Sequence, residues 1–530
     1  MKTWCVWVAC AVLGGCESGA YTNKALKTHG APPPPSGASF DIKPRGNERV
    51  MVLLALSGGG SRAAYFSGKV MLDLQQAGLL EEVDAISSVS GGSLAGAYYC
   101  TTRDEGDPAE VAPRVWSEAE VKQLMSRNYL AHWIANQFWP VNIVRYWCTA
   151  FDRSDIMAQT LADNLFDHPV TGGDLTLGEL NPARPALILN ATNATRNPSG
   201  ASADAFTAAA PKQYGSVFTF TREDFTDRLG SDVNRYSVAR AVMASATFPG
   251  VFQDMTLRDF RTGRERFMHV FDGGNSDNLG LLSVKRVIRN AESWPEERRP
   301  ERYVVISVDA YTRPDGVDPD DADPRSRLDR FVDSNFMDSI DALLTVSRWG
   351  VLSQFIRDEG EQRRLREQQR QDSPAQQATS AAAKSVDDET WKALQQRDVP
   401  SPSPVLPPEA GLAEGGAGED AGAGAADVPP PEADVADAGE SGRQPRPAAH
   451  LGEDWEPIDL DEDRLLFWHI EFADLQATDG KLCRAVNSIP TDFRLPEGAT
   501  ALLDAAADAL VTANTAKLAQ VRAALGLGAR

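Results

Sequence analysis

The sequence predicts an α/β fold in which a mainly parallel central sheet is covered by helices on both faces. Two observations lead to this prediction. Several apolar runs are continuous rather than alternating, as in strands that are buried on both faces. The first two runs are each followed by a glycine-rich turn and a helix-like stretch, which is the βαβ order of a parallel sheet.

The elements follow one another in a regular order. VMVLLAL, YVVISVD and LLFWHIEF are apolar runs of strand length. Phe66, Val70 and Leu74 are spaced four apart, as on one face of a helix, and Gly78 predicts the end of that helix. The expected strands cover residues 50–56, 83–89, 185–190 and 303–309 and begin again near 465, and the expected helices cover 63–77, 92–99 and 499–525.

Residues 1–16 are typical of a bacterial lipoprotein signal. Lys2 precedes an apolar run that is too short to span a membrane, and LGGC resembles a lipobox, whose cysteine, Cys16, is lipidated and becomes the new N-terminus. The alternatives are a plain secretory signal and a frayed N-terminus. Residues 17–48 are interpreted as a Pro-rich tether, and Glu17 favours the outer membrane as the destination.

Charge is distributed unevenly along the chain. The formal net charge of −22 argues against nucleic acid as a partner. Residues 401–450 carry nine acidic residues against two arginines, hence −7, and their Ala, Gly and Pro cannot bury enough apolar surface to fold. We therefore expect a catalytic core over 49–358, a charged helix and disordered acidic insert over 359–452, and a strand and helix over 453–530 that complete the same domain.

Cysteines and short motifs exclude other functions. Three of the six cysteines lie in the first sixteen residues, so the others allow at most one internal disulfide. No CxxC pair points to zinc. Neither G-x-x-x-x-G-K-[ST] nor G-x-G-x-x-G occurs, so a nucleotide is not an expected partner.

Two glycine-rich turns raise the question of whether they form one catalytic site. LSGGGSR covers residues 56–62 and SSVSGGS covers residues 87–93. The second turn resembles the nucleophile elbow G-x-S-x-G, with Ser88 in place of the first glycine. Ser90 would then be a nucleophile, and the alternative is that it caps the helix that follows.

The first turn can supply backbone donors for an oxyanion. No side chain obstructs the amides of Gly58, Gly59 and Gly60, and the helix that follows adds its dipole. Gly58 precedes Ser90 by 32 residues, the length of one βαβ crossover. Neighbouring parallel strands would therefore bring both turns to one edge of the sheet.

A serine hydroxyl needs a base to become a nucleophile. None of the six histidines lies in a distinctive motif. Asp272, in HVFDGGNSDNLG, follows an apolar pair and precedes two glycines that leave space around it, so it is the candidate base. A hairpin turn at Asp272-Gly273 is the alternative. Asp277 and Asn278 are expected to brace this loop.

GGGSR, SVSGG and DGG, in this order, resemble the motifs of the patatin-like phospholipases. Residues 244–252 (ASATFPGVF) resemble the A-S-x-x-F-P segment of that family, and residues 272–280 (DGGNSDNLG) resemble its D-G-G-x-x-x-N block. The resemblance covers residues 50–282. Ser88 and Ala63 stand where the family often has glycine, and both are small enough to preserve the turns.

The resemblance implies a patatin-like three-layer sandwich and a lipid acyl hydrolase that needs no cofactor. It makes Ser90 the nucleophile and Asp272 the base of a Ser–Asp dyad that acts through an acyl-serine. The other residues that it implies are the oxyanion glycines Gly58, Gly59 and Gly60 and the supporting residues Arg62, Gly92, Gly273 and Gly274. An ordinary surface charge is the alternative for Arg62.

The resemblance also implies carboxylic esters of phospholipids or lysophospholipids as substrates. The expected lipid anchor would hold the enzyme at a membrane surface, where such substrates lie. A neutral-lipid or general carboxylesterase is the enzymatic alternative. A lipoprotein that binds lipid without catalysis is the third interpretation.

Residues 133–147 (WIANQFWPVNIVRYW) contain three tryptophans. Such aromatic residues are found at membrane interfaces, and they can also line a groove for an acyl chain. A third interpretation, which we prefer to these two, is an aromatic core helix that is broken at Pro140.

Overall fold

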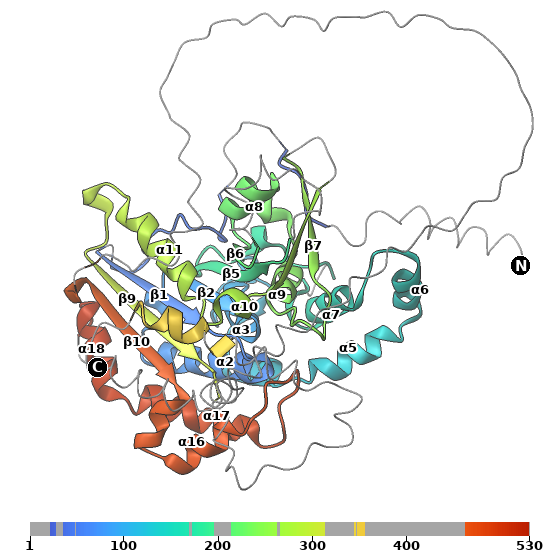
Figure 1. The fold of residues 1–530 in the computed structure, drawn as a ribbon. Coiled ribbons are helices and arrows are strands. Elements are labelled where there is room, and N and C mark those ends of the chain that lie inside the picture. Colours follow the sequence, from blue (N-terminus) through green and yellow to red (C-terminus); the bar gives the residue numbers. More distant parts are fainter. Residues whose placement is uncertain are drawn as a thin grey trace, which may run out of the picture. The chain divides into compact units, whose positions relative to one another are not determined.

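The computed structural model describes most of the predicted core (Figure 1). The described residues are 22–27, 35–47, 49–168, 172–195, 214–261, 266–312, 344–345, 347–355, 460 and 462–528. All of them belong to one compact unit. The expected signal with Cys16 and the expected insert at 359–452 lie outside the described residues.

The described strands form one eight-stranded mixed sheet and a separate two-stranded ribbon. They are β1 (Val50–Leu56), β2 (Ala85–Val89), β3 (Thr102–Arg103), β4 (Arg114–Val115), β5 (Ala186–Asn193), β6 (Val217–Thr219), β7 (Met255–Asp259), β8 (Arg266–Asp272), β9 (Arg302–Asp309) and β10 (Leu465–Glu471). The order across the sheet is β10-β9-β1-β2-β5-β8-β7, with β6 also paired to β5. The run from β10 to β5 is parallel, while β6, β7 and β8 pair antiparallel.

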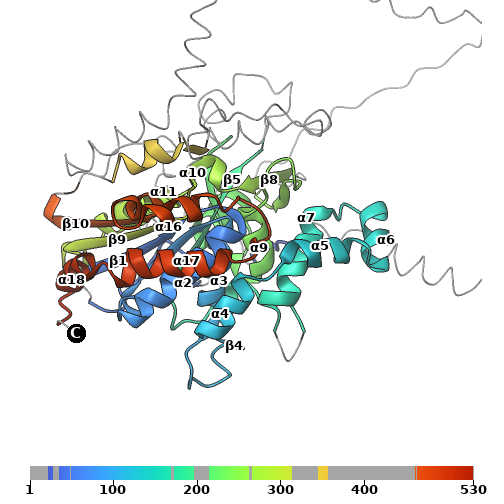
Figure 2. The same cartoon turned by 90° about the horizontal axis from the view of Figure 1, so that it is seen from below.

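The described helices lie on both sides of this sheet (Figure 2). They are α2 (Gly60–Gln76), α3 (Gly91–Cys100), α4 (Glu118–Met125), α5 (Tyr129–Gln137), α6 (Pro140–Cys148), α7 (Arg153–Leu161), α8 (Arg222–Leu229), α9 (Val238–Ser245), α10 (Gly274–Asp277), α11 (Leu281–Glu292), α16 (Gly480–Asn487), α17 (Ala499–Ala507) and α18 (Thr515–Ala524). None of the helices in the described ranges combines the length and apolar character that crossing a bilayer requires.

Two hydrophobic cores sandwich the sheet. Along β1, Val52 and Leu54 belong to a core that includes residues of α2, α3 and α17. Met51 and Leu53, which point the other way, belong to a second core with α11 and residues 349–355. Because β1 is buried on both faces, its sequence is continuously apolar. The predicted three-layer α/β fold with a mainly parallel sheet is confirmed.

Most predicted elements are found close to their expected bounds. The five expected strands are β1, β2, β5, β9 and β10, and the first two expected helices are α2 and α3. The single C-terminal helix expected over 499–525 is wrong, because α17 continues into a π-helical turn at Asp508–Thr512 and the chain then leaves the helix before α18 begins. The side chain of Asn514 then caps α18 by accepting a hydrogen bond from the Lys517 amide. The uniform Ala/Leu pattern does not reveal this interruption.

The expected tether does not extend to residue 48. Ala38, Phe40 and Ile42 are buried in the two cores. Further upstream, the Asn23 side chain donates to the Arg258 carbonyl at 2.9 Å. The domain therefore begins before residue 49, because the apolar residues that follow the prolines find a place in the core.

The core helix expected within residues 133–147 is also wrong. The chain forms two short helices, α5 and α6. Tyr129 and Trp133 of α5 pack against the core, whereas the aromatic residues from Phe138 to Trp147 face solvent. Phe138 is 75% exposed, Trp139 61% and Trp147 81%. The expected break at Pro140 is confirmed: α5 ends at Gln137, and Pro140 begins α6 at its first turn, where its missing N–H is not needed.

Candidate active site

Ser90 lies on a tight turn between β2 and α3, as the elbow pattern predicts. Its φ of 49° and ψ of −120° make it the one non-glycine residue with positive φ in the described part of the chain. An L-residue is strained in this region, and such strain persists where the surrounding structure enforces it. Its hydroxyl makes no capping hydrogen bond to α3, so the helix-cap interpretation is wrong.

The strand register brings Asp272 to the end of β2. Asn190 of β5 pairs with Val89 on one side and with β6 on the other. The next residue, Ala191, pairs with β6 and with Asp272. β2 and β8 therefore pair with the same edge of β5, one after the other. The end of β2 lies next to the end of β8. Since Ser90 follows β2 and Asp272 ends β8, their side chains meet.

The two side chains share a hydrogen bond. Ser90 Oγ donates to Asp272 Oδ2 at 2.9 Å, and the Gly274 amide donates to Asp272 Oδ1 at 2.8 Å. The carboxyl group is buried, while Ser90 is partly exposed. The chain continues from Asp272 through Gly273 into α10, so the hairpin alternative is wrong.

Burial raises the pKa of the Asp272 carboxyl to about 6, because the charged form loses its water. Hydrogen bonds from the Gly274 amide and from Ser90 oppose this increase. Such a carboxylate is ionised at neutral pH and is still basic enough to accept a proton from a hydroxyl. The pair thus has the geometry and the basicity that activation of a serine requires.

The first glycine turn lies between β1 and α2. Gly59 and Gly60 have φ values of 139° and 60°, which glycine adopts without the strain of a side chain. Their amides have no hydrogen-bond partner among the described residues. The Gly58 amide instead donates to the Asn278 carbonyl at 3.0 Å. The expectation that Gly58 supplies an oxyanion donor is therefore wrong, because its N–H is already used.

The two glycine turns are in direct contact. A Cβ atom at Gly91 would collide with the Gly60 carbonyl, so this close approach requires glycine. A Cβ atom at Gly58 would lie 3.2 Å from the Cβ of Ser90. The Gly91 amide, which the sequence interpretation did not include, also lacks a partner among the described residues. An amide directly after the nucleophile is a usual oxyanion donor. The two turns form one site.

Comparison with protein families decides the identity of this region. Residues 54–285 match the family model described as patatin-like phospholipase, and this range contains both turns and Asp272. Over these residues the chain is a patatin-like phospholipase domain. A search of curated proteins finds no match.

The comparison with solved structures finds matches from human and bacterial sources. Human GIVD cytosolic phospholipase A2 has 15% identity and a TM-score of 0.30, and the match covers 49% of this chain and 43% of that one. VipD from Legionella pneumophila has 12% identity and a TM-score of 0.19 over 59% and 58% of the two chains. The ExoU–SpcU complex from Pseudomonas aeruginosa has 12% identity and a TM-score of 0.24 over 72% and 76%. The chain thus spans less than half the length of the human enzyme.

In the patatin-like domain, Arg62 holds the start of α2. It is 2% exposed, so the surface-charge alternative is wrong. Its Nε donates to the Ala310 carbonyl at 2.9 Å. Its terminal nitrogens donate to the Ile489 carbonyl at 2.6 Å and to Thr491 Oγ1 at 2.9 Å. Arg62 therefore ties the glycine turn to the end of β9 and to a segment from the far C-terminal part of the chain.

Three residues that the sequence interpretation did not single out also hold the patatin-like site. The Ser90 amide donates to Ser245 Oγ at 2.9 Å, and Ser245 Oγ donates to the Asn190 carbonyl at 2.5 Å. The Asp492 carbonyl accepts the Ser61 amide at 2.9 Å. Ser245 belongs to the ASATFPGVF segment, whereas nothing in the sequence marks Asn190 or Asp492. Both contribute backbone carbonyls, and the buried side chain of Asn190 also donates to the Ser88 carbonyl at 2.9 Å.

The supporting glycines that the resemblance implied lie close to neighbouring backbone. A Cβ atom at Gly92 would lie 2.6 Å from the Ser57 carbonyl, and one at Gly273 would collide with the backbone of β5. The Asp277 carboxylate accepts the Leu282 amide at 2.6 Å and so caps α11. This contact is a helix cap, and the expected bracing of the loop after β8 by Asp277 and Asn278 stays a prediction.

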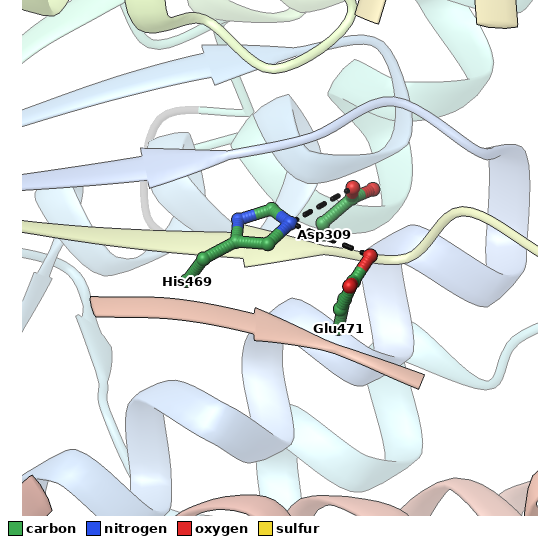
Figure 3. A group of neighbouring side chains, drawn as sticks. All are labelled: Asp309, His469 and Glu471. Carbon is green, nitrogen blue, oxygen red and sulfur yellow. Dashed lines mark ion pairs between the residues drawn. The ribbon is translucent and has the colours of Figure 1, made fainter. Parts of the chain in front are cut away.

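A cluster of charged side chains lies at the carboxyl ends of β9 and β10 (Figure 3). His469 Nε2 lies 3.5 Å from Asp309 Oδ2 and 3.6 Å from Glu471 Oε2. Arg348, which is 1% exposed, donates to both carboxylates at 2.5 Å. Burial lowers the pKa of His469, but hydrogen bonds to the two carboxylates outweigh it and raise this pKa to about 9. Two cations therefore balance two anions.

The residue types of this cluster are also those of a metal centre. Asp309, His469 and Glu471 offer ligand atoms within 4.8 Å of one another. However, the Arg348 guanidinium already bridges both carboxylates, and a protonated His469 cannot donate a lone pair. We interpret the group as a structural charge cluster that joins β9, β10 and residues 347–355.

Proposed function

We propose that the protein is a lipid acyl hydrolase that cleaves carboxylic esters of phospholipids or lysophospholipids through Ser90 and Asp272. The family match supports a lipid hydrolase. The observation that carries the proposal is the 2.9 Å hydrogen bond from Ser90 Oγ to Asp272 Oδ2, beside backbone amides that have no partner among the described residues.

In the proposed cycle, Asp272 accepts the hydroxyl proton of Ser90 while Oγ attacks the ester carbonyl. The amides of Gly59, Gly60 and Gly91 stabilise the tetrahedral oxyanion. The departing alcohol takes the proton from Asp272 and leaves an acyl-serine. Asp272 then takes a proton from a water molecule, which attacks the acyl group. As the bond between Oγ and the acyl carbon breaks, Asp272 returns this proton to Ser90 Oγ and the fatty acid leaves.

The substrate class of the proposal comes from the family and not from the dyad, which would serve any ester. Lipidation of Cys16, if the lipobox is used, would hold the enzyme at the outer membrane, beside phospholipid. Hydrolysis of phospholipid vesicles in preference to triacylglycerol emulsions would support the proposal, and the opposite preference would favour a neutral-lipid esterase. Mass spectrometry of the N-terminal peptide tests whether Cys16 is acylated.

Labelling by a fluorophosphonate tests the nucleophile directly. We expect the wild-type protein to be labelled and Ser90→Ala to be unlabelled and inactive on vesicles. Ser488→Ala is a matched control, because the hydroxyl of Ser488 is exposed and, among the described residues, bonds only to the nearby Ala485 carbonyl. Labelling that persists in Ser90→Ala would overturn the assignment. A folded, lipid-binding but unlabelled wild-type protein would favour the non-catalytic interpretation.

The pH dependence of hydrolysis tests the base. Since Asp272 accepts a proton only when ionised, we expect kcat/KM for a soluble ester to fall as pH decreases through about 6. The decrease should approach about tenfold for each further pH unit. A pH–rate profile measures it, and circular dichroism at each pH confirms that the protein stays folded. Activity that is constant down to about pH 4.5 would contradict this role, since an ordinary exposed carboxyl titrates near pH 4.

A further inference from the structure

Exposed hydrophobic side chains are concentrated on α6 and on the segment that joins α5 to it. Of the ten large hydrophobic residues that are exposed in the described part of the chain, eight lie between residues 134 and 147. They are Ile134, Phe138, Trp139, Val141, Ile143, Val144, Tyr146 and Trp147. Figures 1 and 2 both show α5 and α6 extending away from the central sheet. We call these eight residues, the two helices and the segment between them the aromatic tip.

The burial pattern of α6 is the reverse of that expected for a helix in water. Its one buried side chain is polar: Asn142 is 1% exposed and donates to the Asn136 carbonyl at 2.9 Å. The five large hydrophobic residues of α6 are all exposed. A helix on the surface of a water-soluble protein normally buries its apolar side chains and exposes its polar ones. This arrangement therefore suits an apolar or interfacial environment.

The charge of the aromatic tip fits a lipid surface. Residues 126–151 contain no Asp or Glu, although the whole chain has a net charge of −22. Arg127 and Arg145 lie within this stretch. Tryptophan and tyrosine prefer the region of lipid headgroups, and basic residues beside them are attracted by anionic lipids. A surface for an ordinary soluble partner would not need to exclude carboxylates over such a length.

The tip is attached to the domain by specific contacts. The Trp133 indole N–H donates to the Arg153 carbonyl at 2.9 Å, and the Asn136 side chain donates to Thr160 Oγ1 at 2.8 Å. Both acceptors belong to α7, so α5 is held on the domain. The Asn128 side chain caps α5 by accepting the Ala131 amide. The exposed side chains are thus presented by a defined pair of helices.

Aromatic contacts connect the tip with the glycine turn. The ring of Trp133 packs edge-on against Phe252 at 5.2 Å, and Phe252 packs edge-on against Phe493 at 5.2 Å. Phe493 follows Asp492, whose carbonyl accepts the amide of Ser61 at the start of α2. An apolar series of side chains therefore leads from α5 to the site of the proposed oxyanion.

We propose that the aromatic tip docks on the headgroup region of a phospholipid bilayer and so brings the Ser90 site to its substrate. This inference rests on the proposed lipid hydrolase function, and it names the surface by which the enzyme reaches lipid. Phe138, Trp139 and Trp147 enter the interface, while Arg127 and Arg145 lie at the level of the headgroups. The docking is independent of any acyl chain on Cys16.

Flotation with vesicles of phosphatidylcholine and phosphatidylglycerol tests the docking. Every protein carries Ser90→Ala, so that lipid is not consumed, and Cys16→Ser, so that no acyl anchor is attached. We expect this parent to float with the vesicles, and Phe138→Ser/Trp139→Ser/Trp147→Ser to bind at least about tenfold more weakly. Val111→Ser, which removes an exposed hydrophobic side chain elsewhere, is the matched control and should bind like the parent.

The outcomes separate docking from catalysis and from dimerisation. A parent that does not float, or a triple variant that floats equally well, overturns the docking proposal. A parent that is dimeric by light scattering and becomes monomeric in the triple variant would assign the tip to a second copy of the chain. If the triple variant unfolds, Trp147→Ser alone provides the same test, because this side chain is 81% exposed. Failure of the Ser90-intact protein to hydrolyse a soluble ester overturns the proposed function and leaves the docking result intact.

Discussion

Asp272→Asn is expected to hydrolyse a soluble ester about 10³ to 10⁴ times more slowly than the wild-type protein, because it lacks the base. The substitution should preserve the fold. An asparagine can still accept the Gly274 amide with its carbonyl oxygen and can donate to Ser90 Oγ with its amide, so both hydrogen bonds of the carboxylate have a replacement.

The same variant is expected to be more stable than the wild-type protein at about pH 8. Burial raises the pKa of Asp272 from 3.8 to about 6, so the protonated form stabilises the fold and this contribution is lost as pH rises through about 6. At higher pH the buried charge costs up to about 3 kcal/mol, which a neutral asparagine avoids. Enzymes often lose stability through such functional groups.

Initial rates on a soluble ester and urea unfolding at about pH 8 measure both effects. Ser90→Ala is the control for the rate, since it removes the nucleophile and leaves the carboxylate in place. An inactive Asp272→Asn that is less stable than the wild-type protein would mean that Asp272 has a structural role. An active variant would exclude Asp272 as the base.

Arg348→Met is expected to destabilise the fold by about 3 to 5 kcal/mol, because it leaves two buried carboxylates without their main counter-charge. Arg348 is 1% exposed and donates to Asp309 and Glu471, and His469 alone cannot replace both bonds. Methionine has a similar length, so the effect comes from the lost charge and not from a cavity.

Urea unfolding at neutral pH measures the loss. Lys122→Met is the matched control, because Lys122 pairs with Glu118 and Asp504 at a more exposed site. Removing an exposed ion pair costs less than about 1 kcal/mol. If Arg348→Met loses no more stability than Lys122→Met, the charge cluster does not fasten residues 347–355 to the sheet.

Much of the site could be predicted because its chemistry depends on local backbone shape. Ser90 sits on a turn whose neighbours must be small, and the collision that a side chain at Gly91 would cause explains the glycine pair after it. Asp272 could be recognised as the candidate base because it ends an apolar strand and two glycines follow it. The strands of the core were also predictable, since burial on both faces requires continuous apolar runs.

Other features could not be predicted because they depend on contacts between distant segments. The Gly58 amide is used by Asn278, 220 residues later, so the choice of oxyanion donors depends on the loop after β8. Arg62 needs acceptors near residue 490. The exposure of Trp139 was missed because an apolar helix has the same composition in a core and at an interface.

The sequence by itself determined which chemistry is available: an elbow serine, a glycine turn and a carboxylate at a strand end. The tertiary structure decided which of these groups meet, which amides are left without partners and which aromatic residues face solvent. The physical reason is that strand propensity and turn geometry act over a few residues. Register between β2, β5 and β8, in contrast, is set by packing and hydrogen bonds across the whole sheet.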